Sequence, residues 1–170
     1  MKTLSPKGSK NEMTTSYTFK TPIGFIKICE ENGKLTSLSI QQGEPETTLS
    51  SNSTRHSELL YEAYKQINEY FAGKRKKFEL PICCMGTAFQ KQVWEELQRI
   101  PYGETRSYED IAAAIGNPKA VRAVGQANNR NRLLIIVPCH RVIHKNGDIT
   151  GFACGTEVKK YLLDLEKDYL

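Results

Sequence analysis

Apolar and polar side chains alternate in three short runs in the first half of the chain, at residues 16–19, 23–28 and 35–40. Turn-forming residues, among them Asn32-Gly33, separate the runs, and the pattern predicts the strands of a small sheet. Farther on, apolar residues recur at helical spacing over residues 59–71, which predicts one amphipathic helix covering that sheet. The intervening residues 43–53 are rich in Ser, Thr and Glu and predict a flexible connection.

The second half of the chain shows the spacing of short, closely spaced helices. Thr87 and Gln90 form a capping-box pattern ahead of a helix that ends at Pro101-Tyr102-Gly103. Ser107 and Asp110 repeat that pattern ahead of a shorter helix. Each cap stands directly before apolar residues at helical spacing, so both helix starts are predicted from local signals alone.

The next signals predict a helix-turn-helix arrangement. The second helix stops at Gly116, and Asn117-Pro118 predicts the N-cap and first position of a third helix over residues 119–128. Two short helices joined by a tight glycine-containing turn are typical of helix-turn-helix proteins. Asn146-Gly147 then predicts a hairpin that would form a wing, and a last helix is predicted from about Thr156 to the C-terminus.

These patterns predict a mixed α/β (α+β) fold. A small N-terminal sheet-plus-helix domain would be followed by a mostly helical, winged helix-turn-helix-like domain. A chain of 170 residues is long enough for two such units sharing a face. The predicted boundaries are a disordered N-terminus over residues 1–14, an N-terminal α/β domain over 15–82 and a C-terminal domain over 83–170.

Composition narrows the class of protein. The longest uninterrupted apolar runs have five residues, whereas a membrane-spanning helix needs about 20, so we expect no membrane partner. The first dozen residues are polar and lack the apolar segment of a secretory signal, so we expect a cytoplasmic protein, or a nuclear one in a eukaryote. Five cysteines without a CxxC pair favour reduced thiols, and we expect neither a structural metal nor a cofactor.

Charge is unevenly placed along the chain. The formal net charge is +5, and no acidic residue occurs between Asp110 and Asp148. Such a concentrated positive field suits a polyanion such as nucleic acid, although a solvated basic face is the simpler alternative. The six basic residues of this interval are Lys119, Arg122, Arg130, Arg132, Arg141 and Lys145.

The predicted third helix carries small residues around one long side chain, Arg122. A helix with little side-chain bulk can lie against a narrow groove, and a single arginine on it can enter the base stack or hold the place of an extruded base. Small apolar residues in a helix are also typical of ordinary core packing, and the spacing alone leaves that alternative open.

The tetrad Pro138-Cys139-His140-Arg141 lies inside the acid-free interval, directly after an apolar run. A thiol reacts as its thiolate, and cationic surroundings with a nearby base lower the pKa of a cysteine from about 8.5. We therefore expect Cys139 to be a nucleophile with a lowered pKa. The alternative is an inert buried cysteine, because free cysteine is among the most buried residue types.

With its flanks the tetrad reads Ile135-Ile136-Val137-Pro138-Cys139-His140-Arg141-Val142-Ile143, which resembles the active-site signature of the O6-alkylguanine-DNA alkyltransferases, also called methylated-DNA-protein-cysteine methyltransferases. The resemblance spans residues 89–166, about half the chain, while the first half resembles the family only in size and pattern. The family's further motifs occur at the family's spacing: Tyr102-Gly103-Glu104-Thr105, Ser107-Tyr108, Gly116-Asn117-Pro118, Ala120-Val121-Arg122-Ala123-Val124-Gly125, Asn146-Gly147 and Thr150-Gly151-Phe152-Ala153.

The resemblance implies an irreversible, stoichiometric DNA repair reaction. Cys139 would take the alkyl group from O6 of guanine, and from O4-alkylthymine as a further candidate substrate. His140 would deprotonate the thiol through a water, and Glu166 would orient the histidine. Asn131 would support the active-site turn, and Tyr108 would give a proton to the departing guanine.

The resemblance also implies how the substrate is bound. The protein would act as a monomer on double-stranded DNA through the minor groove, and Arg122 would occupy the vacated stack. The chemistry itself needs no metal and no cofactor. We expect the DNA contacts to come from Ser107, Arg122, Ala123, Gly125, Arg130 and Arg141. We expect the pocket for the base to be lined by Tyr108, Val142, Phe152, Ala153 and Cys154.

Three departures from the family pattern occur close to these residues. The usual Asn-Pro is Asn131-Arg132, which removes a fixed φ angle beside the supporting asparagine. The usual tyrosine of the Thr-Gly-Tyr loop is Phe152, which lacks the hydroxyl. A glycine pair is replaced by Cys154-Gly155, and we hypothesise that the Cys154 side chain narrows the pocket for bulky adducts.

Three other functional classes remain open at this point. A non-catalytic reader of alkylated bases would have no use for an acceptor thiol at Cys139. A winged-helix regulator with a redox-sensing cysteine would leave Tyr108, Asn131 and Glu166 without roles. A cysteine hydrolase would use Cys-His chemistry, but no oxyanion motif favours it.

Overall fold

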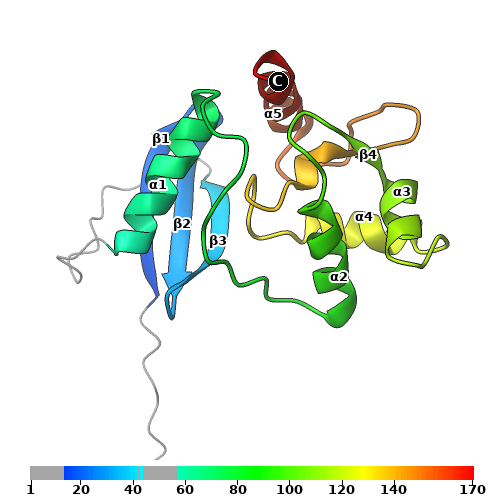
Figure 1. Cartoon of the computed structure of the whole chain (residues 1–170), viewed down its shortest axis with the longest axis horizontal. Coiled ribbons are helices and arrows are strands. Elements are labelled where there is room, and N and C mark those ends of the chain that lie inside the picture. The colour runs from blue at the N-terminus through cyan, green and yellow to red at the C-terminus, as the bar shows by residue number, and fades with distance from the viewer. Residues whose placement is uncertain (1–13, 42, 44–56) are drawn as a thin grey trace, which may run out of the picture.

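The computed structural model describes residues 14–41, 43 and 57–170, and it forms two halves that face each other (Figure 1). A sheet and one helix form the first half, and four helices form most of the second. The predicted disordered N-terminus and the predicted flexible connection lie almost wholly outside the described residues. No helix within the described ranges is long and apolar enough to cross a membrane.

The first half is built on a three-stranded antiparallel sheet in the order β1-β2-β3, as the alternating runs predict. Asn32 and Gly33 both have positive φ, 52° and 73°, and these angles suit the two-residue turn that joins β2 to β3. The strands are β1 (Thr15–Thr21), β2 (Gly24–Glu31) and β3 (Lys34–Gln41).

One helix, α1 (Glu58–Phe71), covers the sheet, which confirms the predicted amphipathic element. The hydroxyl of Ser57 accepts hydrogen bonds from the backbone N–H groups of Leu59 and Leu60 and thereby caps the helix. Its apolar face turns inward toward the buried faces of the strands. This face carries Leu60, Ala63, Ile67 and Tyr70.

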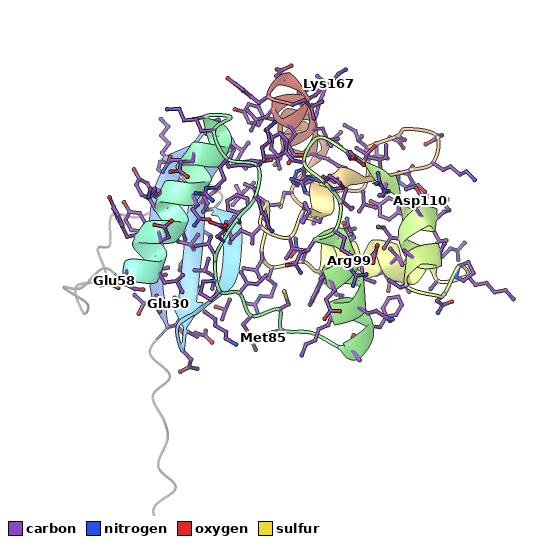
Figure 2. The ribbon with its side chains drawn as sticks, in the orientation of Figure 1. Glu30, Glu58, Met85, Arg99, Asp110 and Lys167 are labelled. Carbon is purple, nitrogen blue, oxygen red and sulfur yellow. The ribbon has the colours of Figure 1, made fainter. Side chains whose placement is uncertain are left out.

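The helices of the second half are α2 (Ala88–Leu97), α3 (Tyr108–Ala114), α4 (Val121–Asn129) and α5 (Thr156–Asp168). Both predicted capping boxes are present. The Gln90 side chain accepts from the N–H of Thr87 while the Thr87 hydroxyl accepts from the N–H of Gln90, and Ser107 and Asp110 make the same exchange. Asp110 lies in the first turn of α3 (Figure 2).

Two local predictions are wrong. The third helix does not begin at Pro118, because Asn117 and Ala120 form a separate turn, Ala120 N–H to Asn117 O at 3.0 Å, and α4 begins only at Val121. The predicted wing is a turn without a second strand. Residues Val142–Ile143 form β5, which pairs in parallel with β4 (Arg106–Ser107), while the N–H of His144 closes the turn by donating to Asp148 O at 2.9 Å.

The two halves are joined by backbone as well as by side chains. The connection after α1, on which Met85 lies, runs between them (Figure 2). The N–H of Leu38 in β3 donates to Arg132 O at 2.8 Å, and the N–H of Leu134 donates back to Leu38 O at 3.2 Å. The edge strand of the sheet therefore holds a segment that lies only a few residues before Cys139, and one continuous apolar core extends through both halves.

Candidate active site

The segment before Cys139 is folded into two very tight turns. Ile135 is buried and has φ of 72°, with the N–H of Ile136 donating to Leu134 O at 2.8 Å across it. A β-branched residue in this region is strained by about 1–3 kcal/mol, so surrounding contacts must hold it there. Pro138 makes the second turn, with φ of −80° and ψ of 62°, and directs Cys139 into the interior.

Asn131 holds this turn together, as the resemblance implies. Its Nδ2 donates to Val137 O at 2.8 Å and to Leu133 O at 3.4 Å. Its Oδ1 accepts from the N–H of Leu133 at 2.9 Å. One side chain thus fastens both ends of the strained segment and fixes the position of the residue that follows.

Cys139 is the first residue of a short 3-10 helix, η1 (Cys139–Arg141), and its side chain is 3% exposed. Burial raises the pKa of the Cys139 thiol to about 11, while a hydrogen bond from Asn131 and the charge of Lys159 act in the opposite direction. The expectation of a lowered pKa is therefore wrong, because loss of water outweighs the nearby cations. In the resting protein the thiol is protonated and needs a base.

His140, the next residue in the chain, can act as that base. It is fully buried, and its Nε2 lies 2.7 Å from Glu166 Oε1 on α5. The carboxylate can only accept, so Nε2 carries the hydrogen and Nδ1 is left with its lone pair. Nδ1 has no hydrogen-bond partner among the described residues. Burial lowers the pKa of His140, although Glu166 opposes this shift, so the ring is neutral at physiological pH.

Glu166 is the centre of a dense set of donors. Its Oε1 accepts from His140 Nε2 at 2.7 Å, from Tyr70 Oη at 2.8 Å and from Arg141 Nη2 at 2.9 Å. Its Oε2 accepts from Arg141 Nε at 2.8 Å and from the N–H of Gly103 at 3.0 Å. Burial raises the pKa of Glu166, but the hydrogen bonds from His140 and Arg141 outweigh it, and the net pKa lies below the ordinary range.

Arg141 has a structural partner inside the protein and does not lie on the surface predicted to contact DNA. Sequence analysis placed it among the DNA contacts, yet its guanidinium is 7% exposed and is held by Glu166 and by Ile100 O at 2.7 Å. Ser107 is likewise buried, with its hydroxyl capping α3. The exposed residues of the predicted DNA-contacting set are Arg122, Ala123 and Arg130, with Gly125 half-buried between them on α4.

Three of the residues predicted to line the base pocket lie close to Lys159, a residue that the sequence patterns did not single out. Lys159 on α5 is fully buried, and its Nζ donates to Val142 O. The same Nζ lies 5.9 Å from the centre of the Tyr108 ring and 5.4 Å from that of Phe152. These contacts bring Tyr108, Val142 and Phe152 together beside Cys139.

A sequence signal for Lys159 does exist. It stands three residues before the buried Leu162 and seven before Glu166, so helical spacing places all three on one face of α5. The pattern alone does not separate a buried lysine from one whose side chain reaches solvent. Tyr161, an apolar ring on the same helix, is 37% exposed.

The chain matches known proteins along almost its whole length. Residues 88–168 match the DNA binding domain of 6-O-methylguanine DNA methyltransferase, and residues 15–83 match the ribonuclease-like domain of the same protein. The chain belongs to the O6-methylguanine DNA methyltransferase family.

Individual members of the family are similar over most of their length. The constitutive methylated-DNA–protein-cysteine methyltransferase of Bacillus subtilis is 54% identical over 157 residues, which cover 88% of this chain and 93% of that protein. The enzyme of Methanosarcina acetivorans is 47% identical over 148 residues, covering 87% and 95%.

Solved structures give the same result. A crystal structure of Mycobacterium tuberculosis O6-methylguanine methyltransferase superimposes with a TM-score of 0.80 at 42% identity, covering 93% of this chain and 95% of that one. A second structure, of the M. tuberculosis OGT in complex with DNA, has a TM-score of 0.78 at 43% identity, covering 89% and 92%.

The departures from the O6-methylguanine DNA methyltransferase pattern have structural counterparts. Arg132, where the family has proline, offers its carbonyl to Leu38 of β3, so a bridge between the halves restrains the turn. Phe152 is buried with its ring near Lys159, where a hydroxyl is not needed for packing. Cys154 is exposed and lies close enough to Cys139 for a negative charge on it to raise the pKa of the Cys139 thiol.

The cysteines do not form part of a metal-binding cluster in the described part of the chain. Over residues 14–41, 43 and 57–170, no three His, Cys, Asp or Glu side chains come together as a metal site. All five cysteines are free thiols, and Cys139 is the buried one among them.

Proposed function

We propose that this protein repairs O6-alkylguanine in DNA by transferring the alkyl group irreversibly to Sγ of Cys139, as a methylated-DNA-[protein]-cysteine S-methyltransferase that reacts once. The observation that carries the proposal is the chain Cys139, His140 and Glu166. Cys139 and His140 are consecutive buried residues, and Nε2 of the neutral His140 ring lies 2.7 Å from the carboxylate of Glu166. Membership of the O6-methylguanine DNA methyltransferase family supports O6-alkylguanine in DNA as the substrate.

The proton path follows from the tautomer. His140 Nδ1, the ring nitrogen with its lone pair free, takes the proton of the Cys139 thiol through a water. The thiolate then attacks the alkyl carbon, forming the S–C bond while the bond between that carbon and O6 breaks. Glu166 stabilises the imidazolium that forms, in the way a buried carboxylate supports a catalytic histidine.

Tyr108 serves the leaving group. The developing negative charge on guanine needs a donor, and Tyr108 stands beside the pocket with a pKa that burial raises, so its hydroxyl remains protonated. The imidazolium of His140 then releases the proton it took from the thiol, and a proton returns to Tyr108, so both groups end in their starting states. The net change is a thiol and an alkylated base becoming a thioether and a normal guanine.

The exposed face of α4 is the proposed DNA contact. Lys119, Arg122 and Arg130 are exposed, and a Cβ added at Gly125 would meet the Tyr108 ring at 3.9 Å, which is ordinary contact. Internal packing therefore does not demand the glycine, and close approach of a minor groove gives its small size a reason. Arg122 would fill the stack after the alkylated base is extruded. The protein would act on this duplex as a monomer.

Cys154 is proposed to limit the size of the alkyl group. Its place near Cys139 puts a side chain where the family has glycine. Rates with O6-methylguanine and O6-benzylguanine, compared before and after Cys154→Gly, test this. Selective acceleration of the benzyl substrate is expected, and an unchanged ratio contradicts the idea.

The deciding experiment is intact-mass spectrometry after mixing the protein with a duplex containing O6-methylguanine. We expect one added methylene mass, about 14 Da for a covalent thioether, mapped to Cys139. Cys139→Ala should show no addition, and Cys154→Ala should react like the wild type. Addition to a different cysteine would contradict the assignment of the acceptor.

The same experiment separates the alternatives. Tight binding to the lesion without a change in mass would favour a non-catalytic reader. Neither binding nor transfer would favour a winged-helix regulator, and turnover beyond one equivalent would favour a hydrolase. The two-domain division at residues 15–82 and 83–170 and a cytoplasmic location stay predictions.

A further inference from the structure

The N-terminal half places one hydroxyl inside the network that surrounds Glu166. Tyr70 lies in the last turn of α1 and is fully buried. Its Oη donates to Glu166 Oε1 at 2.8 Å, although the two residues are 96 positions apart in the chain. The same oxygen atom accepts from Nε2 of His140.

Packing alone explains the ring of Tyr70 but not its hydroxyl. The ring lies 5.6 Å from that of Phe78, 5.5 Å from that of Phe71 and 6.1 Å from that of Tyr102, measured between ring centroids. A phenylalanine would make all three contacts. A buried hydroxyl needs a hydrogen-bond partner, and the partner of Tyr70 is the carboxylate that holds the proposed base.

We propose that Tyr70 is a positioning residue of the alkyl-transfer reaction, whose hydroxyl holds Oε1 of Glu166 in line with Nε2 of His140. This inference rests on the proposed function. It assigns the N-terminal half a part in the chemistry beyond packing, since α1 then sets the geometry of a network whose other side chains come from the second half.

Electrostatics gives the hydroxyl a second effect. Each donor on a carboxylate disperses its negative charge and weakens its attraction for the proton of His140. The groups that face His140 are Glu166 and Lys159 from α5 and Arg141 from η1. Without the Tyr70 donor, Oε1 of Glu166 carries more negative charge and attracts the protonated His140 ring more strongly. The pKa of His140 should therefore rise. A role confined to packing would not change that pKa.

Tyr70→Phe removes the hydroxyl and keeps the ring. Single-turnover kinetics on an O6-methylguanine duplex should show a transfer rate constant lowered roughly tenfold, because a misdirected base is poorly placed for proton transfer. Affinity for the duplex should be unchanged. NMR titration of the His140 ring, with Cys139→Ala in the background so that no transfer occurs, should give a higher midpoint when Tyr70→Phe is added.

Two control variants separate positioning from stability. Tyr64→Phe removes a hydroxyl from the same helix, where the ring packs on Tyr17 and Phe19, and should leave rate and titration unchanged. Phe78→Leu loosens the ring cluster around Tyr70 but keeps the hydroxyl. It should lower the melting temperature without moving the His140 midpoint.

Either of two results would overturn the inference. One is an unchanged rate and an unchanged His140 midpoint in Tyr70→Phe. The other is a Phe78→Leu variant that shifts both quantities as much as Tyr70→Phe does. Failure of the proposed function is separately visible, because the wild type would then transfer no methyl group while the titration, which needs no substrate, still reports on Tyr70.

Discussion

The two halves of the molecule treat buried polar groups differently. In the described part of the first half, the buried Thr and Gln side chains carry no charge: these are Thr21, Thr36 and Gln66. The second half buries basic and acidic side chains within reach of Cys139 or of one another: His140, Arg141, Lys159 and Glu166.

This difference indicates that the first half is a scaffold and that the second half contains the candidate active site. Burying charges costs free energy unless they are paired and hydrogen-bonded, so a cluster of Arg141, Lys159 and Glu166 around the neutral His140 points to a role other than stability. The first half contributes a neutral group to the cluster, the Tyr70 hydroxyl, while the backbone of Leu38 holds the segment that leads to Cys139. It aligns the charged residues without adding to their charge.

The largest effect is expected from Glu166→Gln. Removing the charge leaves Arg141 buried without its partner, which costs about 3–5 kcal/mol of unfolding free energy by urea titration. Because the folded pKa of Glu166 lies below the ordinary range, its contribution is complete above that range and is lost as pH falls through the folded value. The variant should therefore lose less stability on acidification.

Glu157→Gln is the matched control for this prediction. Glu157 lies on the same helix and is exposed, so its neutralisation should change the unfolding free energy by less than about 0.5 kcal/mol. Equal destabilisation by the two substitutions would remove the contrast between the buried cluster and the surface.

Asn131→Ala is expected to act next most strongly. It removes the three hydrogen bonds that the Asn131 side chain makes to the backbone of the turn and weakens the support of the strained Ile135, so the unfolding free energy should fall by about 1–3 kcal/mol. Transfer of the methyl group should slow by about 10²-fold, because the position of Cys139 depends on this turn. Urea unfolding and single-turnover kinetics measure the two effects.

Asn68→Ala tests whether the first half behaves in the same way. Its Nδ2 donates to Tyr64 O at 2.8 Å on the exposed side of α1, where water can replace the bond. Rate and stability should stay close to those of the wild type. A loss of transfer here comparable to that of Asn131→Ala would show that the turn is not specially dependent on its asparagine.

Lys159→Met should have an intermediate effect on rate. The charge of Lys159 lowers the pKa of Cys139 against the effect of burial, so its removal should raise that pKa above about 11. The rate of Cys139 alkylation by iodoacetamide, followed against pH, should shift to higher pH and fall roughly tenfold at neutral pH. Lys160→Met, an exposed neighbour, should leave the profile unchanged.

Gly125→Ala is expected to have the smallest effect on the fold. The added Cβ has room beside Tyr108, so the melting temperature should remain within about 2 °C of the wild type. Binding to duplex DNA should nevertheless weaken, while reaction with free O6-methylguanine base should not. Unchanged duplex affinity in a fluorescence-anisotropy titration would argue against close approach of DNA at this position.

Local signals in the sequence predicted much of the fold. The alternating runs, the Asn32-Gly33 turn and the two capping boxes each depend on residues a few positions apart, and all of them are present. The active-site tetrad was recognisable for the same reason, since its chemistry lies in adjacent residues. The sequence by itself therefore determined the three-stranded sheet, most of the helices, their order and the candidate nucleophile.

Only the tertiary structure decided which polar groups meet. The parallel pairing of β5 with β4 replaced the predicted wing, and Arg141 turned inward to Glu166 instead of outward to DNA. Burial of Cys139 raised a pKa that its neighbours in sequence suggested would be low. Tyr70 reached Glu166 across 96 residues. Such outcomes depend on burial and on contacts between distant segments, and neither is a property of any short stretch of the chain.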